Sequence, residues 1–160
     1  MDIKELKPTS IWHYFDAITG VPRPSKKEER IREFLLNFAK EQNLEVKVDK
    51  TGNVVITKEA TPGCEGAPTV ILQAHMDMVC EKNGDVKHDF ERDPIETYID
   101  GEWVKARGTT LGADNGIGMA AAMAVLADKE LKHGRIQALF TVDEETGLTG
   151  AFGLESGMID

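Results

Sequence analysis

The sequence has few cysteines, no excess of positive charge and no long apolar run, and each of these absences excludes a class of protein. Two cysteines, Cys64 and Cys80, are too few for the disulfide framework of a small secreted domain. A formal net charge of −9 argues against nucleic acid and an anionic membrane as partners. No apolar stretch approaches membrane-spanning length, and the first residues lack the apolar core of a secretory signal. These features predict a cytoplasmic protein with two free thiols.

The overall composition is that of a globular protein. Hydrophobic residues make up 41% of the 160 positions and charged residues 29%, which is typical of a folded chain and not of a disordered one. A chain of this length can bury roughly two-thirds of its unfolded surface, as one ordinary domain does. We therefore expect a single domain with one substantial core.

Two amphipathic helices are predicted near the N-terminus. Ser10 is expected to cap a first helix that runs through Ile18 and ends at Gly20. Ser25 and Glu28 have the spacing of a capping box in front of a second helix. The apolar residues of that second helix recur at helical spacing and are expected in the core, namely Ile31, Phe34, Leu35 and Phe38.

Two pairs of alternating segments predict antiparallel hairpins. Residues 44–48 and 54–57 alternate between apolar and polar side chains around a turn at 51–53. Residues 96–99 and 103–106 do the same around Asp100-Gly101, a dipeptide that favours a tight hairpin turn. The second pair follows a polar excursion and is predicted to extend from the main fold.

Three apolar segments predict the centre of the fold. Residues 69–74 (TVILQA) and 136–142 (IQALFTV) are continuous apolar runs and are expected to form strands covered on both faces. Residues 115–127 are small and apolar on nearly every side, which indicates a buried helix. A strand, a long connection, a helix and a second strand predict an α/β fold. We expect a mixed, mainly parallel sheet flanked by helices, with the second hairpin as an antiparallel extension.

Five polar side chains follow these buried elements. His75 and Asp77 come just after the first buried strand, Glu144 and Glu145 follow the second, and Asp114 precedes the buried helix. Ligands of open α/β sheets gather beyond the carboxyl ends of the strands, so we expect the five side chains to meet at one edge. Histidine and carboxylates can hold two transition metal ions, which activate water and polarise a carbonyl.

Each motif taken alone has an ordinary interpretation. A His-x-Asp sequence is common in proteins without a site, Asp114 has the position of a helix cap, and acidic pairs usually lie in water. Glu144 and Glu145 would face opposite ways in a strand, so the extended conformation must end by Val142 or Asp143. Asp143 is itself an alternative acid, and Cys80 is an alternative ligand. The metal-site hypothesis depends on all three segments meeting.

Residues 73–157 resemble the catalytic domain of co-catalytic zinc metallopeptidases, and most closely that of the aminoacyl-histidine dipeptidases, also called cytosol non-specific dipeptidases. Four motifs carry the resemblance: QAHMDMV at 73–79, WVKARGTTLGADNGIG at 103–118, DEETG at 143–147 and GAFGL at 150–154. The second of these is long and highly specific.

The resemblance implies a role for each of the five residues. His75 would bind one metal ion, Glu145 would bind a second, and Asp114 would bridge the two, with the Asp114-Asn115 peptide bond cis. Asp77 would orient His75, and Glu144 would act as the general base on the attacking water. The implied cofactors are two divalent ions, zinc in the first place and cobalt or manganese otherwise.

The resemblance also implies what these residues leave out. Family members use a further carboxylate and a second histidine from later in the chain, and they carry a separate lid domain that forms dimers. We therefore expect residues 1–160 to be the N-terminal part of the catalytic domain, inactive when isolated, in a homodimeric full-length protein. The implied reaction is hydrolysis of Xaa-His dipeptides. The alternatives are an amidohydrolase of N-acyl amino acids, a Mg²⁺-dependent phosphohydrolase and a non-catalytic metal-binding domain.

Overall fold

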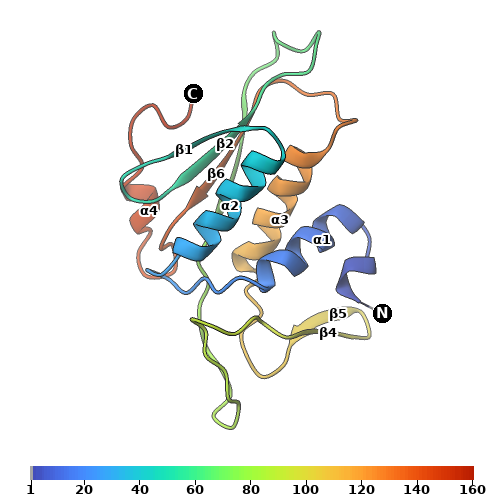
Figure 1. Ribbon diagram of the computed structural model, residues 1–160, viewed down its shortest axis with the longest axis vertical. Coiled ribbons are helices and arrows are strands. Elements are labelled where there is room, and N and C mark those ends of the chain that lie inside the picture. The colour runs from blue at the N-terminus through green and yellow to red at the C-terminus, as the bar shows by residue number, and fades with distance from the viewer. Residues whose placement is uncertain (1) are drawn as a thin grey trace.

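A four-stranded sheet with helices packed on one face forms the centre of the computed structural model, which describes residues 2–160 (Figure 1). Helices α2 and α3 pack on the sheet and α1 packs against α3, so these three helices form one layer. The elements in chain order are η1 (Ile3–Glu5), α1 (Thr9–Thr19), α2 (Glu29–Glu41), β1 (Glu45–Val48), β2 (Val54–Lys58), β3 (Val70–His75), β4 (Thr97–Asp100), β5 (Trp103–Ala106), α3 (Ala113–Ala127), β6 (Ile136–Thr141) and α4 (Thr149–Phe152).

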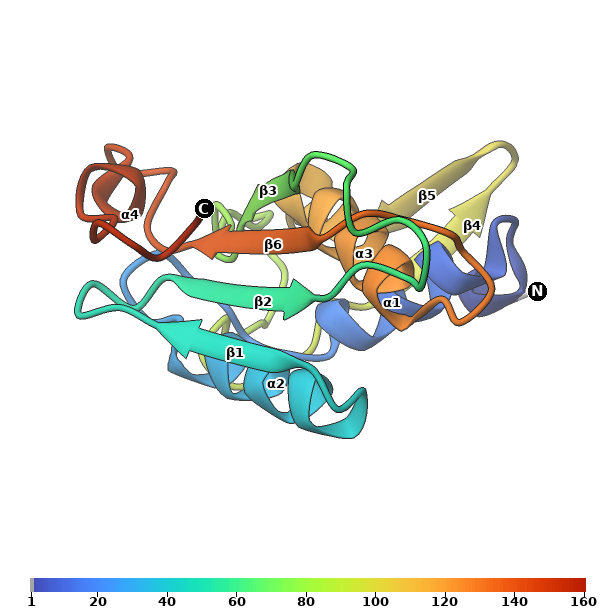
Figure 2. The ribbon, with the colours of Figure 1, turned by 90° about the horizontal axis from the view of Figure 1, so that it is seen from above.

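The strand order of the sheet is β1-β2-β6-β3, as Figure 2 shows from above. β1 pairs with β2 and β2 with β6 in antiparallel fashion, whereas β3 and β6 are parallel. The predicted mixed sheet flanked by helices is confirmed, but the expectation that it is mainly parallel is wrong. The reason is that the hairpin of β1 and β2 joins the main sheet through β6 and adds two antiparallel pairs.

β6 and β3 differ in how deeply the sheet buries them. Every residue of β6 is buried, as its apolar sequence predicts. β3 lies at the edge of the sheet, and its first residues Val70 and Ile71 are 51% and 39% exposed. The prediction that this strand is covered on both faces is therefore wrong. Only its last two residues, Ala74 and His75, are buried.

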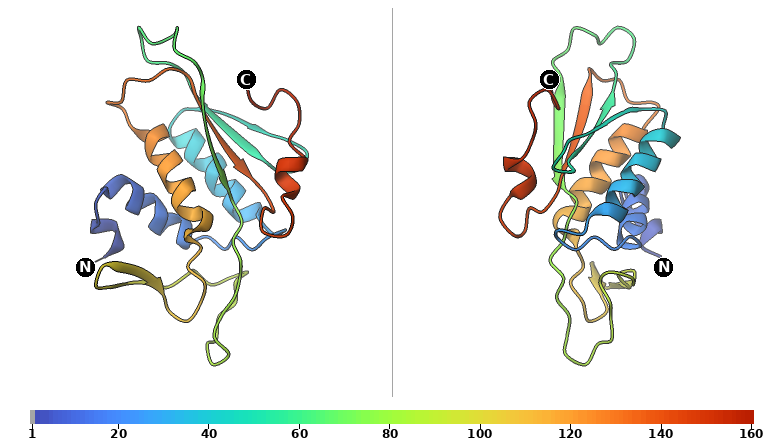
Figure 3. Two further views of the ribbon diagram at one scale, coloured as in Figure 1. Left: turned by 180° about the vertical axis from the view of Figure 1, so that it is seen from behind. Right: turned by 60° about the vertical axis from the view of Figure 1, so that its left-hand side comes forward.

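The core lies mainly between the sheet and its helices. Leu35 of α2, Met119 and Met123 of α3, and Phe140 of β6 belong to one cluster of fully buried side chains. A smaller cluster occupies the opposite face of the sheet, where Figure 3 shows α4 and the C-terminal segment. That smaller cluster consists of Val55, Leu139 and Met158, with Leu154 and Ile159 packed against it.

The predicted helix starts differ from the observed ones. α1 begins at Thr9 with Pro8 as its N-cap residue, so Ser10 lies inside the helix and does not cap it. α2 begins after Glu28, and no side chain caps it. The capping box of Ser25 and Glu28 is therefore wrong, because Ser25 donates to Asp77 and Glu28 accepts the backbone N–H groups of Lys26 and Asp143.

The predictions for the second hairpin and the buried helix are confirmed. β4 and β5 form a separate two-stranded antiparallel sheet, turning at Gly101 with a φ of 61°. α3 covers the predicted buried helix and begins two residues earlier than expected. Cys64 and Cys80 are both free. Within residues 2–160, none of the helices has the length and apolar character that a bilayer crossing requires.

Candidate metal centre

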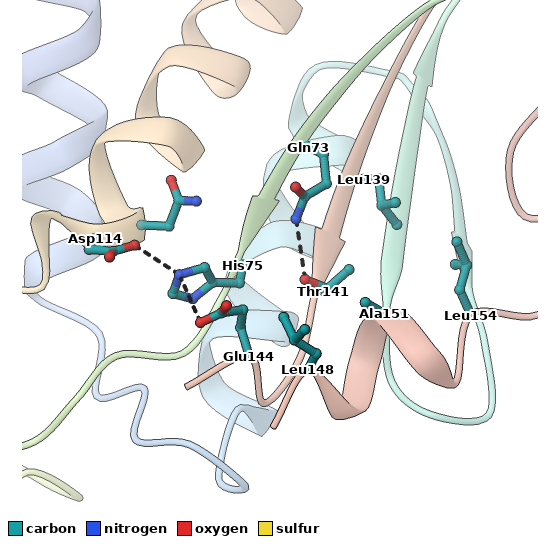
Figure 4. Close-up of a pocket in the computed structure, with 10 residues that line it drawn as sticks. Gln73, His75, Asp114, Leu139, Thr141, Glu144, Leu148, Ala151 and Leu154 are labelled. Atoms are coloured by element: carbon teal, nitrogen blue, oxygen red, sulfur yellow. Dashed lines mark hydrogen bonds and ion pairs between the residues drawn. The ribbon is translucent and has the colours of Figure 1, made fainter. Parts of the chain in front are cut away.

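The candidate site lies where the parallel strands β3 and β6 end. The pairing register places His75, the last residue of β3, opposite Thr141, the last residue of β6. Parallel strands share one carboxyl edge, so the residues that follow β6 emerge next to the histidine. Figure 4 shows the side chains of Glu144 and Asp114 directed toward the same ring nitrogen of His75.

The chain turns sharply after β6, and this turn allows two consecutive acids to face the same site. Extended structure ends at Thr141, and Asp143 has a left-handed φ of 46°. The backbone N–H of Glu144 then donates to Oδ1 of Asp77 at 3.0 Å, and that of Glu145 donates to Oδ2 at 3.2 Å. The expectation that the strand ends before these acids is confirmed.

Asp114 reaches the site from the start of α3. The N-cap residue of this helix is Gly112, without a side-chain cap, so Asp114 is not the helix cap that its position suggests. Its φ and ψ of −87° and 108° are not helical, and the Asp114-Asn115 peptide bond is cis, as the resemblance implies. Oδ1 of Asp114 lies 2.9 Å from Nε2 of His75, while its side chain is 84% exposed.

The five predicted residues meet in one place. Nε2 of His75 lies 3.7 Å from Oε2 of Glu144 and 3.9 Å from Oε1 of Glu145. One potential ligand atom from each of His75, Asp114 and Glu145 lies within 4.8 Å of the other two. An imidazole nitrogen and carboxylate oxygens form the donor set that zinc accepts, and manganese and cobalt also bind such atoms. These side chains therefore fit a divalent transition metal.

The titration behaviour of the site follows from its crowded charges. Burial disfavours a charge on His75, yet hydrogen bonds with Asp77 and Asp114 and the charge of Glu144 outweigh it and raise the pKa of the imidazole to about 9. Burial also opposes ionisation of Asp77, but hydrogen bonds from His75, Ser25 and two backbone N–H groups hold its pKa well below the ordinary value. Burial raises the pKa of Glu145.

Asp77 organises the site without being available as a ligand. Its side chain is completely buried, and Oδ1 lies 3.2 Å from Nδ1 of His75. The hydroxyl of Ser25 donates to Oδ2 at 2.6 Å. With the two backbone N–H groups of the 144–145 turn, every side of this carboxylate is engaged. Asp77 therefore fixes both the imidazole and the acidic turn.

The two alternative residues lie outside the ligand group. Both oxygens of Asp143 accept hydrogen bonds, from the hydroxyls of Thr146 and Thr149 at 2.6 Å each, so this acid stabilises the turn that carries its neighbours. Sγ of Cys80 lies 3.6 Å from the backbone carbonyl oxygen of Met78 and is not among the grouped ligand atoms.

Sequence reasoning missed three residues that support the site, all between α1 and α2. Arg23 is 2% exposed and donates to backbone carbonyls beside His75 and Asp114. Glu28 accepts the backbone N–H of Asp143 at 2.8 Å, and burial raises its pKa. Ser25 donates to Asp77. Ser25 and Glu28 have the spacing of a capping box, which suggested a different role for both. For Arg23 the only signal was its position between two prolines.

A cleft of about 470 Å³ adjoins the candidate ligands. His75, Asp114 and Glu144 line its polar end, where Figure 4 also shows the amide of Gln73 and the hydroxyl of Thr141. The remaining wall is apolar and comes from β6 and the segment around α4, through Leu139, Leu148, Ala151 and Leu154. Such a cleft can hold a small molecule with one polar and one apolar part.

Known proteins are similar to this chain over nearly its whole length. The chain is 52% identical over 158 residues to the cytosol non-specific dipeptidase of Escherichia coli (strain K12), which covers 99% of this chain and 33% of that protein. The crystal structure of aminoacylhistidine dipeptidase from Vibrio alginolyticus matches with a TM-score of 0.97 and 57% identity, over 100% of this chain and 33% of that one. A tripeptidase from Staphylococcus aureus matches with a TM-score of 0.79 and 26% identity, over 97% and 42%.

The chain spans about a third of the length of the first two of these relatives. The model of peptidase family M20/M25/M40 matches residues 71–160, a range that is more than half of the chain. It begins within β3 and contains all five residues that meet at the candidate metal centre. On the strength of this match, the chain belongs to peptidase family M20/M25/M40.

Proposed function

We propose that residues 1–160 form the N-terminal part of the catalytic domain of a metal-dependent dipeptidase. The observation that carries the proposal is the meeting of His75, Asp114 and Glu145, whose ligand atoms lie within 4.8 Å of one another. The lid and dimerisation domain and the C-terminal catalytic segment would lie outside these residues. The full-length protein would be a cytoplasmic homodimer, a location that the name of the Escherichia coli relative supports.

Two divalent ions, with zinc as the first choice over cobalt and manganese, would be held by three residues of this chain. His75 would bind one ion through Nε2, since Nδ1 faces Asp77. Glu145 would bind the other, and the exposed carboxylate of Asp114 has an oxygen for each. When bound, such ions acidify water and polarise a substrate carbonyl.

Glu144 has the properties of a general base in this arrangement. Its carboxylate faces the ligand group, with Oε2 3.7 Å from Nε2 of His75, and among residues 2–160 no hydrogen bond holds this carboxylate away from water. It would accept a proton from the attacking water and deliver it to the leaving amine. Asp77 would keep the imidazole of His75 oriented while this happens, because Oδ1 contacts the far ring nitrogen.

The substrates we propose are small peptides, and Xaa-His dipeptides first among them. The names of the Escherichia coli and Vibrio alginolyticus relatives support this choice. The cleft beside His75 suits a small substrate, because it combines a polar end with an apolar wall. An amidohydrolase of N-acyl amino acids would use the same ligands, so the substrate class requires an assay.

The metal part of the proposal is tested by zinc content. In the full-length protein, Asp114→Ala should lower zinc affinity at least about tenfold, the scale on which even the partners of a ligand act. Asp85→Ala is the matched control, because this acid is exposed in the segment between β3 and β4. Equal zinc content in Asp114→Ala and wild-type protein after dialysis would refute the proposed ligands.

The substrate part is tested separately on the zinc-loaded full-length protein. Xaa-His dipeptides, other dipeptides and N-acyl amino acids are compared by kcat/KM. The proposal expects dipeptides to be preferred. A preference for N-acyl amino acids would assign the site to an amidohydrolase, and zinc binding without turnover of any amide would assign it to a non-catalytic domain.

A further inference from the structure

Arg23 is the largest side chain that the fold buries completely. It lies between α1 and α2, and its guanidinium is surrounded by protein although an unpaired charge is costly to bury. Its Nε has no hydrogen-bond partner among the described residues. A fold keeps such a group only if its remaining contacts compensate for the cost, so the contacts of Arg23 need an explanation.

Those contacts join two segments that carry candidate ligands. We call them the His75 loop (residues 75–78) and the Asp114 loop (residues 112–116). Nη1 donates to the backbone carbonyls of Met76 at 3.1 Å and Asp77 at 3.2 Å, next to His75. Nη2 donates to the carbonyl of Gly112 at 2.5 Å, two residues before Asp114. The backbone carbonyl of Arg23 also accepts the N–H of Met78. One residue therefore holds the carboxyl end of β3 and the start of α3 together.

The space around the guanidinium is shaped for it. A Cβ atom at Gly112 would lie 2.5 Å from Nη2 of Arg23, and a Cβ atom at Gly116 would lie 2.9 Å from the same nitrogen. Both distances are shorter than real contacts of this kind. The two glycines of the Gly112-Ala113-Asp114-Asn115-Gly116 motif thus leave room for the arginine.

Arginine suits this position better than lysine does. Its planar fork can place two nitrogens against two different loops at once, whereas an ammonium is a single point of contact. Burial lowers the pKa of Arg23 to about 10, against the charges of Asp77, Cys80 and Asp114, so the group is still charged at neutral pH. Among the described residues, the guanidinium donates three hydrogen bonds, all to backbone carbonyls, which indicates that it fixes the path of the chain.

We propose that Arg23 is a positioning residue that sets the distance between the His75 loop and the Asp114 loop, and thereby builds the metal site. The link between this distance and metal binding rests on the proposed function. The contacts themselves do not depend on it. Arg23 is buried and lies outside both the ligand group and the lining of the cleft, so its effect on catalysis would be transmitted through His75 and Asp114.

The first experiment follows amide hydrogen exchange in the metal-free full-length protein with Arg23→Lys and Arg23→Gln. The reporters are the N–H of Met78, bonded to the carbonyl of Arg23, and the N–H of Gly116, bonded to the carbonyl of Gly112. We expect both amides to exchange about tenfold faster or more in Arg23→Gln, as the loss of hydrogen bonds from a charged donor implies. The N–H of Leu44, at the end of α2, should be unchanged.

The matched control is Leu126→Ala, which empties a fully buried position near the other end of α3. This substitution destabilises the fold without touching either loop. It should speed exchange of all three reporters together. Equal acceleration of the three amides in Arg23→Gln would show a merely structural role and overturn the proposal.

The second experiment reads the metal site directly, through zinc affinity and the visible spectrum of the cobalt-loaded full-length protein. We expect Arg23→Gln to lower zinc affinity about 10- to 100-fold and to change the cobalt spectrum, as loss of an outer partner of ligands does. Arg23→Lys should recover part of both, and Leu126→Ala should change neither. Unchanged affinity and spectrum in Arg23→Gln would overturn the proposal.

Two further outcomes are distinguishable. If wild-type protein binds no zinc or cobalt, the proposed function fails, while the exchange of Met78 and Gly116 still decides whether Arg23 joins the loops. If Arg23→Gln does not fold, Gly116→Ala replaces it. This variant retains the arginine, but its added methyl group would lie 2.9 Å from Nη2 and displace the guanidinium. It should change the cobalt spectrum, and an unaltered spectrum would count against the proposal.

Discussion

His75 has an acidic side chain on each side of its ring, and this placement determines its charge. Asp77 contacts Nδ1 and Asp114 contacts Nε2, so the metal-free imidazole is stabilised as a cation with a pKa of about 9. A metal ion binds only the neutral ring and must displace a proton at neutral pH. The same acids that hold the proton would then neutralise the ion. On metal binding, His75 would thus exchange a proton for a metal ion.

This exchange predicts a pH dependence of stability for the metal-free full-length protein. The folded pKa of His75 is raised above the ordinary value of 6.5, so its contribution to stability is fully present below pH 6.5 and is lost as the pH rises through about 9. The loss should amount to about 3 kcal/mol at most. Urea unfolding in the presence of a chelator measures it, with His75→Gln as the comparison. The same pH profile in both proteins would contradict the prediction.

Glu144 and Glu145 are adjacent, but we expect their substitution to have different effects on zinc binding and on kcat. In the full-length protein, Glu144→Gln should keep its zinc and lower kcat by about 10² to 10⁴, the usual contribution of a general base. Glu145→Gln should lose zinc, because an amide is a poorer ligand than a carboxylate. Zinc content and kcat are measured in parallel, with Glu102→Gln on the β4–β5 turn as the control. The assignment is reversed if Glu144→Gln is the variant that loses zinc.

At the scale of elements, the helices and strands with a continuous apolar pattern could be predicted from the sequence. Burial and hydrogen bonds that depend on segments far along the chain could not. β6 was predictable because most of its residues are apolar, and α3 because apolar or small residues lie on nearly every side of it. The exposure of Val70 in β3 was not, since an apolar run looks the same at an edge and at the centre of a sheet. The spacing of Ser25 and Glu28 is that of a local cap, but their partners Asp77 and Asp143 lie far along the chain.

The candidate site was more predictable than the topology around it. Its prediction needed only β3 and β6 to be parallel and adjacent, which they are, whatever β1 and β2 do on the other side. The turn at Asp143 followed from the requirement that two consecutive acids face one site. Arg23 was not predictable as a partner of these loops, because it donates to backbone carbonyls, and every residue has one whatever its side chain.

α4 presses so closely on the end of β6 that one glycine sets its distance. A Cβ atom at Gly150 would lie 2.3 Å from the backbone oxygen of Val142 and 2.6 Å from its nitrogen. Gly150→Ala should therefore shift α4 and destabilise the full-length protein by about 1 to 3 kcal/mol. Gly66→Ala is the control, because no atom lies within 4 Å of its Cβ position. Thermal unfolding compares the two, and equal midpoints would contradict this account of α4.

At the scale of the whole molecule, the candidate site is supported by buried residues on its interior side and is open to solvent on its outer side. Asp77, Arg23 and Asp143 are buried beneath it and hold its loops through hydrogen bonds. The side chain of Asp114, by contrast, is 84% exposed, and β3 has a free edge beside it. Charges act most strongly where water is excluded, so we expect this exposed side to stabilise the charge that develops in amide hydrolysis less well than a closed site would.

This openness leads to a prediction for the 160-residue chain on its own. Folded and supplied with zinc, it should bind the metal more weakly than the full-length protein and turn over dipeptides at well under ~1 s⁻¹, the lower end of ordinary enzyme rates. Water can reach the ligand group past Asp114, competing for the ions and screening the charge that would develop on the substrate. Circular dichroism establishes that the chain is folded, and zinc titration and dipeptide assays are then run on both proteins at equal concentration. Asp114→Ala in the isolated chain provides the background for metal bound elsewhere. Turnover by the isolated chain at the rate of the full-length protein would show that these residues complete the site by themselves.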